Sequence, residues 1–267
     1  MTEPVSVFRA LHHGRAPDDP LVLPGPWDAA SARALEEAGF PALAVPSAGV
    51  AAALGHEDGH TPADEMFAAV ARIVRAVSVP VSADIEAGYG LEPEELVERL
   101  LAAGAVGCNL EDSVDGVLVD PAHQADLLAR FREAAGGRLF LNARVDVYLR
   151  VAPAGTDREA SAGTAPEAGT GSDREASART DRDADAVDRG RRYAAAGADC
   201  VYPIGAPPEA LPRLAAAVPV PLNALGTPDS PAAVRRLGEL GAARVTFGPA
   251  LQRLAVAAAR EAAEGVR

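Results

Sequence analysis

The stretch LAAGAVGCNLED, residues 101–112, contains the pattern that decides the fold. An alanine- and leucine-rich helical segment ends at a glycine, which can take the left-handed conformation found where helices end, and a short apolar run follows. The same pattern recurs in EEAGFPALAVPS (36–47), YAAAGADCVYPI (193–204) and GELGAARVTFG (238–248). Each copy predicts a helix that leads directly into a buried strand.

The segments between these copies complete a series of eight strands and eight helices. We expect strands at 21–24, 42–46, 79–84, 106–110, 138–143, 199–204, 218–224 and 243–247. The expected helices follow at 28–38, 63–77, 93–103, 121–135, 183–196, 207–216, 230–240 and 249–264. Such alternation gives parallel strands joined by right-handed crossovers, and eight repeats favour closure into a barrel. The predicted fold class is therefore α/β, with residues 1–267 forming a single (β/α)8 TIM barrel.

One segment departs from this pattern. Residues 152–182 contain no Val, Ile, Leu or aromatic residue, and the sequence DREASA occurs twice within them. A segment of this composition cannot bury enough apolar surface to offset the entropy of ordering. We interpret it as a low-complexity, disordered insertion after strand five, more plausibly a tolerated expansion than a lid over the site.

The charge balance limits the partners. The chain carries 25 basic residues, all arginine, against 38 acidic ones, which gives a formal net charge of −13. This surplus of negative charge argues against nucleic acid and anionic membranes as partners. No signal peptide or long apolar run is evident, so we expect a cytoplasmic protein with Cys108 and Cys200 as buried thiols. The lack of lysine also excludes a Schiff-base mechanism.

Acidic residues gather at the predicted ends of neighbouring strands. In a barrel the reactive side chains lie at the carboxyl ends of the strands and in the loops that follow. This rule directs five carboxylates to one rim: Asp58, Asp84, Glu86, Glu111 and Asp112. So many carboxylates repel one another unless a cation lies among them, and all-oxygen ligation favours Mg2+, Ca2+ or Mn2+ over zinc. For Asp112, and for Asp146 beyond strand five, a role as a helix cap or solvated acid is the stronger interpretation.

Two further residues suggest an anionic substrate. Arg144 ends the apolar stretch LFLNAR, where its planar guanidinium could bind a carboxylate or phosphoryl group, or else form a structural salt bridge to a rim carboxylate. Ser47 and the small residues after it could offer hydroxyl and backbone N–H groups to an oxyanion. His56 and His60 fit a mobile gate better than a zinc site, and His12 and His13 are expected on the surface.

Together these motifs resemble the isocitrate lyase and phosphoenolpyruvate mutase superfamily. The resemblance rests on PGPWDAASARALEEAGFPALAVPSAGVAAALGHED (24–58), SADIEAGYG (82–90), CNLED (108–112), NARVD (142–146) and PLNALG (221–226). It implies a metal site formed by Asp84, Glu86, Glu111 and Asp58, with Mg2+ as the cofactor and Mn2+ as a second possibility. It further implies a substrate site formed by Ser47, Ala48, Gly49, Arg144 and Asn223, and a homodimer or homotetramer with an exchanged C-terminal helix.

The resemblance implies cleavage or formation of a C–C or P–C bond beside a small 2-oxo acid or phosphonate, through an enolate. The catalytic set would then comprise Ser47, Asp58 and Arg144. The chain departs from the lyases at Ser113-Val114-Asp115-Gly116-Val117, where they carry a cysteine that acts as acid or base, and at Tyr202-Pro203-Ile204 on strand six. Two alternatives therefore stay open: a metal-dependent decarboxylase or hydrolase of oxaloacetate-like substrates, and an inactive barrel that acts as a binding protein.

Overall fold

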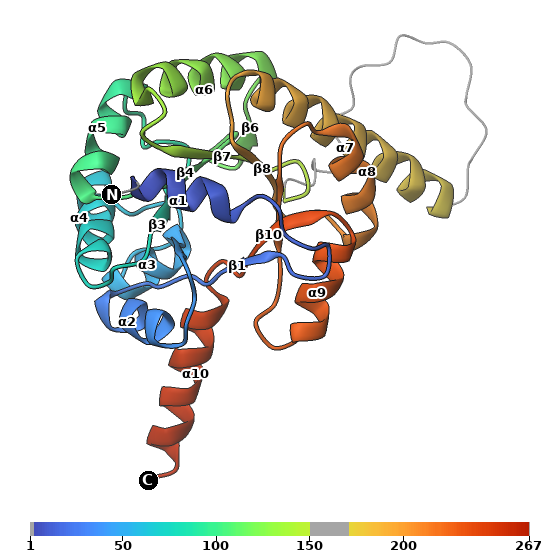
Figure 1. The fold of residues 1–267 in the computed structure, drawn as a ribbon. Coiled ribbons are helices and arrows are strands. Elements are labelled where there is room, and N and C mark those ends of the chain that lie inside the picture. Colours follow the sequence, from blue (N-terminus) through green and yellow to red (C-terminus); the bar gives the residue numbers. More distant parts are fainter. Residues whose placement is uncertain (1–2, 150–170, 267) are drawn as a thin grey trace, which may run out of the picture.

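The computed structural model describes residues 3–149 and 171–266, and for 171–177 only the backbone. One sheet of eight parallel strands lies at its centre, surrounded by helices (Figure 1). The strands are β1 (Leu21–Leu23), β2 (Leu43–Val45), β3 (Val81–Asp84), β4 (Gly107–Glu111), β7 (Phe140–Val145), β8 (Cys200–Pro203), β9 (Leu222–Leu225) and β10 (Ala242–Thr246).

The strand order is that of a nearly closed barrel. The order of pairing is β1-β10-β9-β8-β7-β4-β3-β2, and every pair in it is parallel. Between the two end strands, β1 and β2, the Ala44 N–H donates a hydrogen bond of 3.1 Å to the carbonyl oxygen of Pro24, just beyond β1. The predicted (β/α)8 fold is confirmed.

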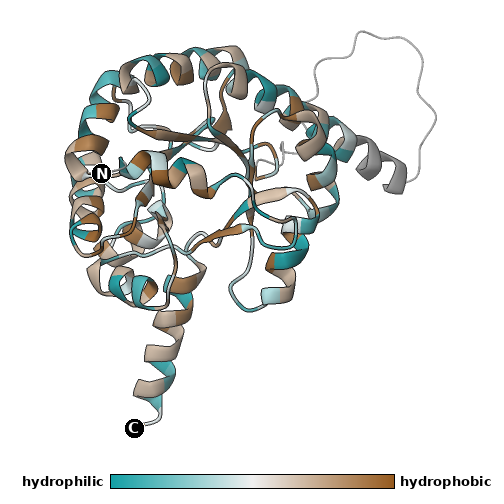
Figure 2. Cartoon of the chain, in the orientation of Figure 1, coloured by the Kyte–Doolittle hydropathy of each residue, from teal (hydrophilic) through white to brown (hydrophobic). Residues whose placement is uncertain are grey.

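Helices cover the outside of this barrel. They are α1 (Pro4–Leu11), α2 (Ala29–Glu37), α3 (Ser47–Leu54), α4 (Ala63–Val74), α5 (Pro93–Ala103), α6 (Pro121–Ala135), α7 (Gly171–Ala195), the short 3-10 helix η1 (Pro208–Ala210), α8 (Leu211–Ala217), α9 (Pro231–Glu239) and α10 (Ala250–Glu264). Their outer faces are largely hydrophilic, whereas the strands are mostly hydrophobic (Figure 2). No helix in the described part of the chain is both long enough and apolar enough to span a membrane.

Helix α1, helix α3 and the hairpin after β4 were not predicted from the sequence. Helix α1 runs across one end of the barrel and buries Val5 and Phe8, and the Phe8 ring meets the edge of Phe140. His12, expected on the surface, is instead 3% exposed and stacks on Phe140. Helix α3 occupies the loop after β2, and the antiparallel hairpin of β5 (Ser113–Val114) and β6 (Val117–Leu118) follows β4.

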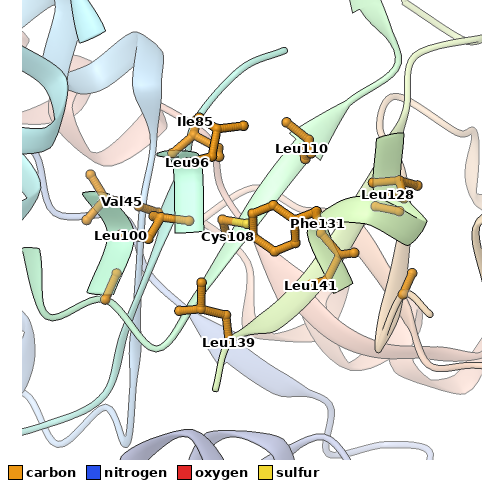
Figure 3. Packing of buried hydrophobic residues seen from close by; sticks show 14 of the residues in the cluster. Val45, Ile85, Leu96, Leu100, Cys108, Leu110, Leu128, Phe131, Leu139 and Leu141 are labelled. Carbon is orange, nitrogen blue, oxygen red and sulfur yellow. The ribbon is translucent and has the colours of Figure 1, made fainter. Parts of the chain in front are cut away.

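The apolar core lies mainly between the sheet and the helices. Outward-facing strand residues such as Val45, Cys108 and Leu141 pack against helical residues such as Leu96 and Phe131 (Figure 3). Alternate residues on the same strands point into the barrel, because successive side chains of a strand face opposite ways. Many of these inward residues are polar, so the barrel interior can carry chemistry. Both cysteines are free and buried, as predicted.

The insertion interrupts the connection from β7 to α7. Residues 152–170 of the segment predicted to be disordered lie outside the described residues. Residues 171–182, which the sequence assigns to the same insertion, form the first turns of α7. The amino-acid composition explains the difference: alanine, glutamate and arginine favour helices even without apolar contacts. Further along α7, Arg192 and Asp188 form an i,i+4 ion pair of 2.7 Å that adds support.

Candidate active site

A cavity of about 1110 Å³ opens at the carboxyl ends of the strands. Its floor and walls include three charged residues whose strands are neighbours in the sheet: Asp84 at the end of β3, Glu111 at the end of β4 and Arg144 on β7. The register places Glu111 directly opposite Arg144, so their side chains lie next to each other on the same face of the sheet. The structure therefore brings these three predicted residues together at one rim.

Arg144 is held by three carboxylates. Its Nε and Nη2 donate to the two oxygens of Asp146, at 2.7 and 2.9 Å, in a bidentate pair. Its Nη1 lies 2.6 Å from Glu111 Oε2 and 3.4 Å from Asp84 Oδ2. The salt-bridge alternative considered for Arg144 is thus realised, although the guanidinium also lines the cavity. Asp146, interpreted from sequence as a cap or solvated acid, is fully buried beneath it.

The carboxylates at this site resist ionisation. Burial, reinforced by the charge of Asp84, raises the pKa of Glu86 to about 7. Burial also raises the pKa of Glu111 to about 8, despite the opposing effect of Arg144. Burial likewise raises the pKa of Asp84. The neighbouring carboxylates raise the pKa of Arg144 even though burial disfavours its charge, so negative charge predominates in the cavity.

The backbone after β3 is strained where it presents Glu86. Glu86 has φ 52° and Tyr89 has φ 57°, in the left-handed region that side chains other than glycine rarely adopt. The Glu86 N–H donates to Asp84 Oδ1 at 3.1 Å, which fixes the turn. Oε1 of Glu86 is buried and has no hydrogen-bond partner among the described residues. Strain of this kind tends to persist at functional sites, where the surrounding structure enforces it.

Helix α3 begins at the cavity wall. Ser47 and Ala48, its first two residues, line the cavity, and the N–H groups of a first helical turn have no partners within the helix. The positive end of the helix dipole therefore points toward the site and favours an anion there. Gly49 does not line the cavity. A Cβ there would lie 3.0 Å from Pro46 Cγ, a tight contact that favours glycine at this position.

The remaining predicted residues lie at different depths. Asp58 lines the cavity on the exposed loop after α3, close enough that its charge raises the pKa of Glu86. Asn223 is fully buried below the cavity and is absent from its lining. The sequence places Asp112 among the rim acids. In the structure it accepts hydrogen bonds from Arg189 (2.9 Å) and Tyr193 (2.7 Å) behind the barrel, as a structural acid would.

Several lining residues were missed from the sequence. Tyr202 on β8 is 3% exposed and lines the cavity. Asn109 lies on the cavity floor and accepts a hydrogen bond of 2.8 Å from Asn142. Asn109 lies two residues before Glu111 on the same strand, so the alternation of side chains could have identified it. Tyr202 lies opposite Arg144 on the neighbouring strand, which only the register of the sheet reveals.

The donor chemistry fits a hard divalent cation. Asp58, Asp84, Glu86 and Glu111 offer only oxygen atoms, the partnerless Oε1 of Glu86 needs a cation or donor, and the raised pKa values reflect unbalanced charge. In the described residues no three His, Cys, Asp or Glu side chains are grouped closely enough to enclose an ion. The reason is local: Nη1 of Arg144 bridges Asp84 and Glu111 and draws both carboxylates toward itself.

Comparison with known proteins gives a consistent result. The family described as "Phosphoenolpyruvate phosphomutase" matches residues 8–267. An uncharacterised protein of Mycobacterium tuberculosis is 33% identical over 260 residues, which cover 97% of this chain and 88% of that protein. A crystal structure from Burkholderia cenocepacia J2315, provisionally titled a phosphonomutase, is 34% identical with a TM-score of 0.80, covering 98% of this chain and all of that one.

Two further similar proteins have a stated activity, and one of them was solved with bound ligands. The oxaloacetate decarboxylase of Rhodopseudomonas palustris is 32% identical over 209 residues, which cover 76% of this chain and 65% of that protein. A phosphonopyruvate hydrolase solved with oxalate and Mg2+ shares the fold, at 21% identity and a TM-score of 0.75, covering 97% of this chain and 85% of that one.

Proposed function

Because the chain belongs to the phosphoenolpyruvate phosphomutase family, a family of lyase- and mutase-type enzymes, we propose that it is a Mg2+-dependent enzyme acting on a small 2-oxo acid or phosphonate. The reaction would break or form a C–C or P–C bond beside the oxo group through an enolate. One observation carries this proposal: Asp84, Glu86 and Glu111 converge with Arg144 in one cavity at the carboxyl ends of the strands.

Four residues would hold the metal. Asp84, Glu86 and Glu111 supply buried oxygens, and Asp58 supplies one from the loop after α3. The bound ion, Mg2+ or Mn2+, would supply positive charge that stabilises a developing enolate oxygen. The phosphonopyruvate hydrolase structure that shares the fold contains Mg2+, in agreement with this choice.

The substrate anion would lie between α3 and Arg144. The Ser47 hydroxyl and the first N–H groups of α3, including that of Ala48, can donate to the oxo-acid end. Arg144 provides the fork for a carboxylate or phosphoryl group, with Asp146 fixing its orientation. In this proposal Gly49 shapes the turn from behind, and Asn223 acts through Thr246, which it binds at 3.2 Å.

Decarboxylation of an oxaloacetate-like acid is a second candidate. A retro-aldol cleavage needs a base to remove a hydroxyl proton, whereas decarboxylation reaches the same enolate without that step. The hairpin β5–β6 presents Ser113 and Val114 to the cavity, in a loop without the cysteine that the lyases carry. The similarity to the oxaloacetate decarboxylase of Rhodopseudomonas palustris supports this candidate.

The C-terminal helix suggests a homo-oligomer. Helix α10 projects from the barrel and none of its residues is buried, so packing against its own barrel does not account for it (Figure 1). Leu254 and Val256 are exposed on it, at 55% and 58%. A separate cavity of about 400 Å³ with apolar walls lies beside β1, lined by residues of α2 and α9. We propose that the α10 of a second copy covers this cavity in a cytoplasmic dimer or tetramer.

The test uses the full-length protein and a panel of pyruvate, oxaloacetate, phosphonopyruvate and methylisocitrate with Mg2+, assayed for consumption and for pyruvate release. We expect turnover of one of these acids, lost with excess EDTA and lost in Asp84→Ala. The control Asp229→Ala removes an exposed acid and should keep full activity. Full activity of Asp84→Ala in EDTA would refute the metal mechanism. If none of these acids is consumed, and oxalate with Mg2+ does not change the melting temperature, a binding protein would be favoured.

A further inference from the structure

A buried arginine lies one layer below the cavity floor. Arg244 on β10 is 0% exposed, and it points the same way as Thr246, the floor residue two positions further along the strand. Its Nε, Nη1 and Nη2 have no hydrogen-bond partner among the described residues. Burial of a guanidinium without acceptors is costly, and arginine does not relieve the cost by losing its proton.

A second donor lies beside it. Asn223 is the register partner of Arg244 on the neighbouring strand β9, so the two side chains enter the barrel together. Thr246 donates to Asn223 Oδ1 at 3.2 Å, which leaves the amide nitrogen of Asn223 directed elsewhere. This Nδ2 is also buried and has no partner among the described residues. Two neighbouring groups that can only donate therefore lack an acceptor.

The residues around Arg244 supply no adjacent negative charge. Burial lowers the pKa of Arg244, and three groups, Cys200, Tyr202 and Asp84, oppose this lowering. Burial raises the pKa of Cys200 and of Tyr202 to about 12, so both stay protonated. Asp84 belongs to the layer above and already faces Arg144.

His12 lies close enough to Arg244 to be affected by its charge, and it is neutral as well. His12, from α1, has Nδ1 2.8 Å from the carbonyl oxygen of Phe8, so this nitrogen must carry the proton and donate. Burial and then the charge of Arg244 lower the pKa of His12 to about 3, so the ring is uncharged at neutral pH. Of the described groups that act on Arg244 through charge, Asp84 in the layer above is therefore the only carboxylate.

We propose that the lower barrel binds one monovalent anion of halide size, held by the Arg244 guanidinium and the Asn223 side-chain amide. An anion supplies both the missing acceptor and the missing charge, whereas a water molecule supplies only the acceptor. The complete burial of both side chains limits the ligand to a small ion. Neither residue lines the cavity, so the anion site lies below the proposed substrate site, to which Asn223 is linked through Thr246.

The test compares the metal-free protein in sodium chloride, sodium bromide and sodium gluconate at equal ionic strength. We expect chloride and bromide to raise the melting temperature saturably, by about 2–4 °C, relative to gluconate. Arg244→Met should abolish the difference between salts. Arg33→Met, which removes an exposed arginine on α2, should retain it. Crystals grown in bromide should show an anomalous peak between Arg244 and Asn223.

A second variant covers the case in which Arg244→Met does not fold. Asn223→Asp places a carboxylate beside the guanidinium and should remove the halide dependence while the protein stays folded. Identical melting in all three salts, or crystals in bromide with water alone beside Arg244, would overturn the proposal. So would an Arg244→Met variant that keeps the full halide response.

Discussion

Magnesium binding should release protons from Glu86 and Glu111. Burial raises the pKa of Glu86 to about 7 and that of Glu111 to about 8, so both carboxyls are largely protonated at pH 6. A carboxyl must be deprotonated to bind a hard cation, and a proton therefore competes with the metal at each position. The dissociation constant for Mg2+ should fall steeply as pH rises from 6 to 8.5.

The pKa values set the size of this effect. At pH 6 roughly 10% of Glu86 and roughly 1% of Glu111 are ionised, against roughly 97% and 76% at pH 8.5. If both carboxylates must ionise, Mg2+ binds up to about 10³-fold more tightly at pH 8.5; if only Glu86 must, the gain is about 10-fold. The measured ratio thus reports how many of the two groups contact the ion.

Isothermal titration calorimetry at pH 6, 7 and 8.5, in two buffers of different ionisation enthalpy, measures the affinity and the protons released. Glu86→Gln should remove the contribution of Glu86, so any pH dependence that remains in this variant reports Glu111. Glu98→Gln, which alters an exposed glutamate on α5, should leave the pH dependence unchanged. An Mg2+ affinity constant within a factor of about 2 across this range, with no proton release, would refute the ligand assignment.

Thermal stability of the metal-free protein gives an independent check on the direction of these two pKa shifts. The folded-state pKa values of Glu86 and Glu111 lie above the ordinary value of 4.5, so folding favours their protonated forms. Their contribution to stability is fully present below pH 4.5 and is lost as pH rises through 7 to 8. The melting temperature in EDTA should therefore fall as pH rises from 4.5 to 8, and Mg2+ should reverse this loss of stability.

Three further predictions concern packing and assembly. Gly107→Ala should destabilise the barrel by about 1–3 kcal/mol, measured by urea unfolding, because a Cβ would lie 2.5 Å from the carbonyl oxygen of Phe140. Tyr193→Phe should cost about 1–3 kcal/mol in the same assay, because it removes a 2.7 Å hydrogen bond to buried Asp112. Leu254→Glu should reduce the oligomer to monomers in light scattering, since it places charge on the exposed face of α10.

Each of these has a matched control or a contrary outcome. Gly265→Ala, near the C-terminus, meets only atoms beyond 3.5 Å and should be neutral; equal losses in both glycine variants would count against the packing argument. An unchanged unfolding free energy in Tyr193→Phe would mean that Arg189, 2.9 Å from the same carboxylate, suffices. A wild-type protein that is already monomeric would refute the proposed role of α10.

The sequence identifies those residues of this site that lie at the ends of strands. Asp84 and Glu111 were identified because each ends a buried run, and the carboxyl ends of parallel strands meet at one rim. Tyr202 was overlooked as a site residue because it lies within an apolar run and differs from its neighbours only in facing inward. Gly49 and Asn223 were placed at the substrate by resemblance, which does not report depth along the barrel axis.

Arg144 shows why the chemistry could not be read from the sequence. Whether a strand-end arginine binds substrate or neighbouring acids depends on register, and here Glu111 lies directly across the sheet from it. Four carboxylates, Asp84, Glu86, Glu111 and Asp146, face one guanidinium, so full ionisation leaves an excess of three negative charges. That excess would repel an anionic substrate.

The excess charge also constrains the order of binding. A divalent cation among Asp84, Glu86 and Glu111 would reduce the excess to one and would weaken the 2.6 Å pair between Glu111 and Nη1 of Arg144. Asp146 would still fix the guanidinium through Nε and Nη2, so the freed Nη1 would be already oriented for a carboxylate or phosphoryl oxygen. In the proposed mechanism, a metal that binds before the substrate would lower this repulsion and free Nη1 of Arg144 for the substrate anion.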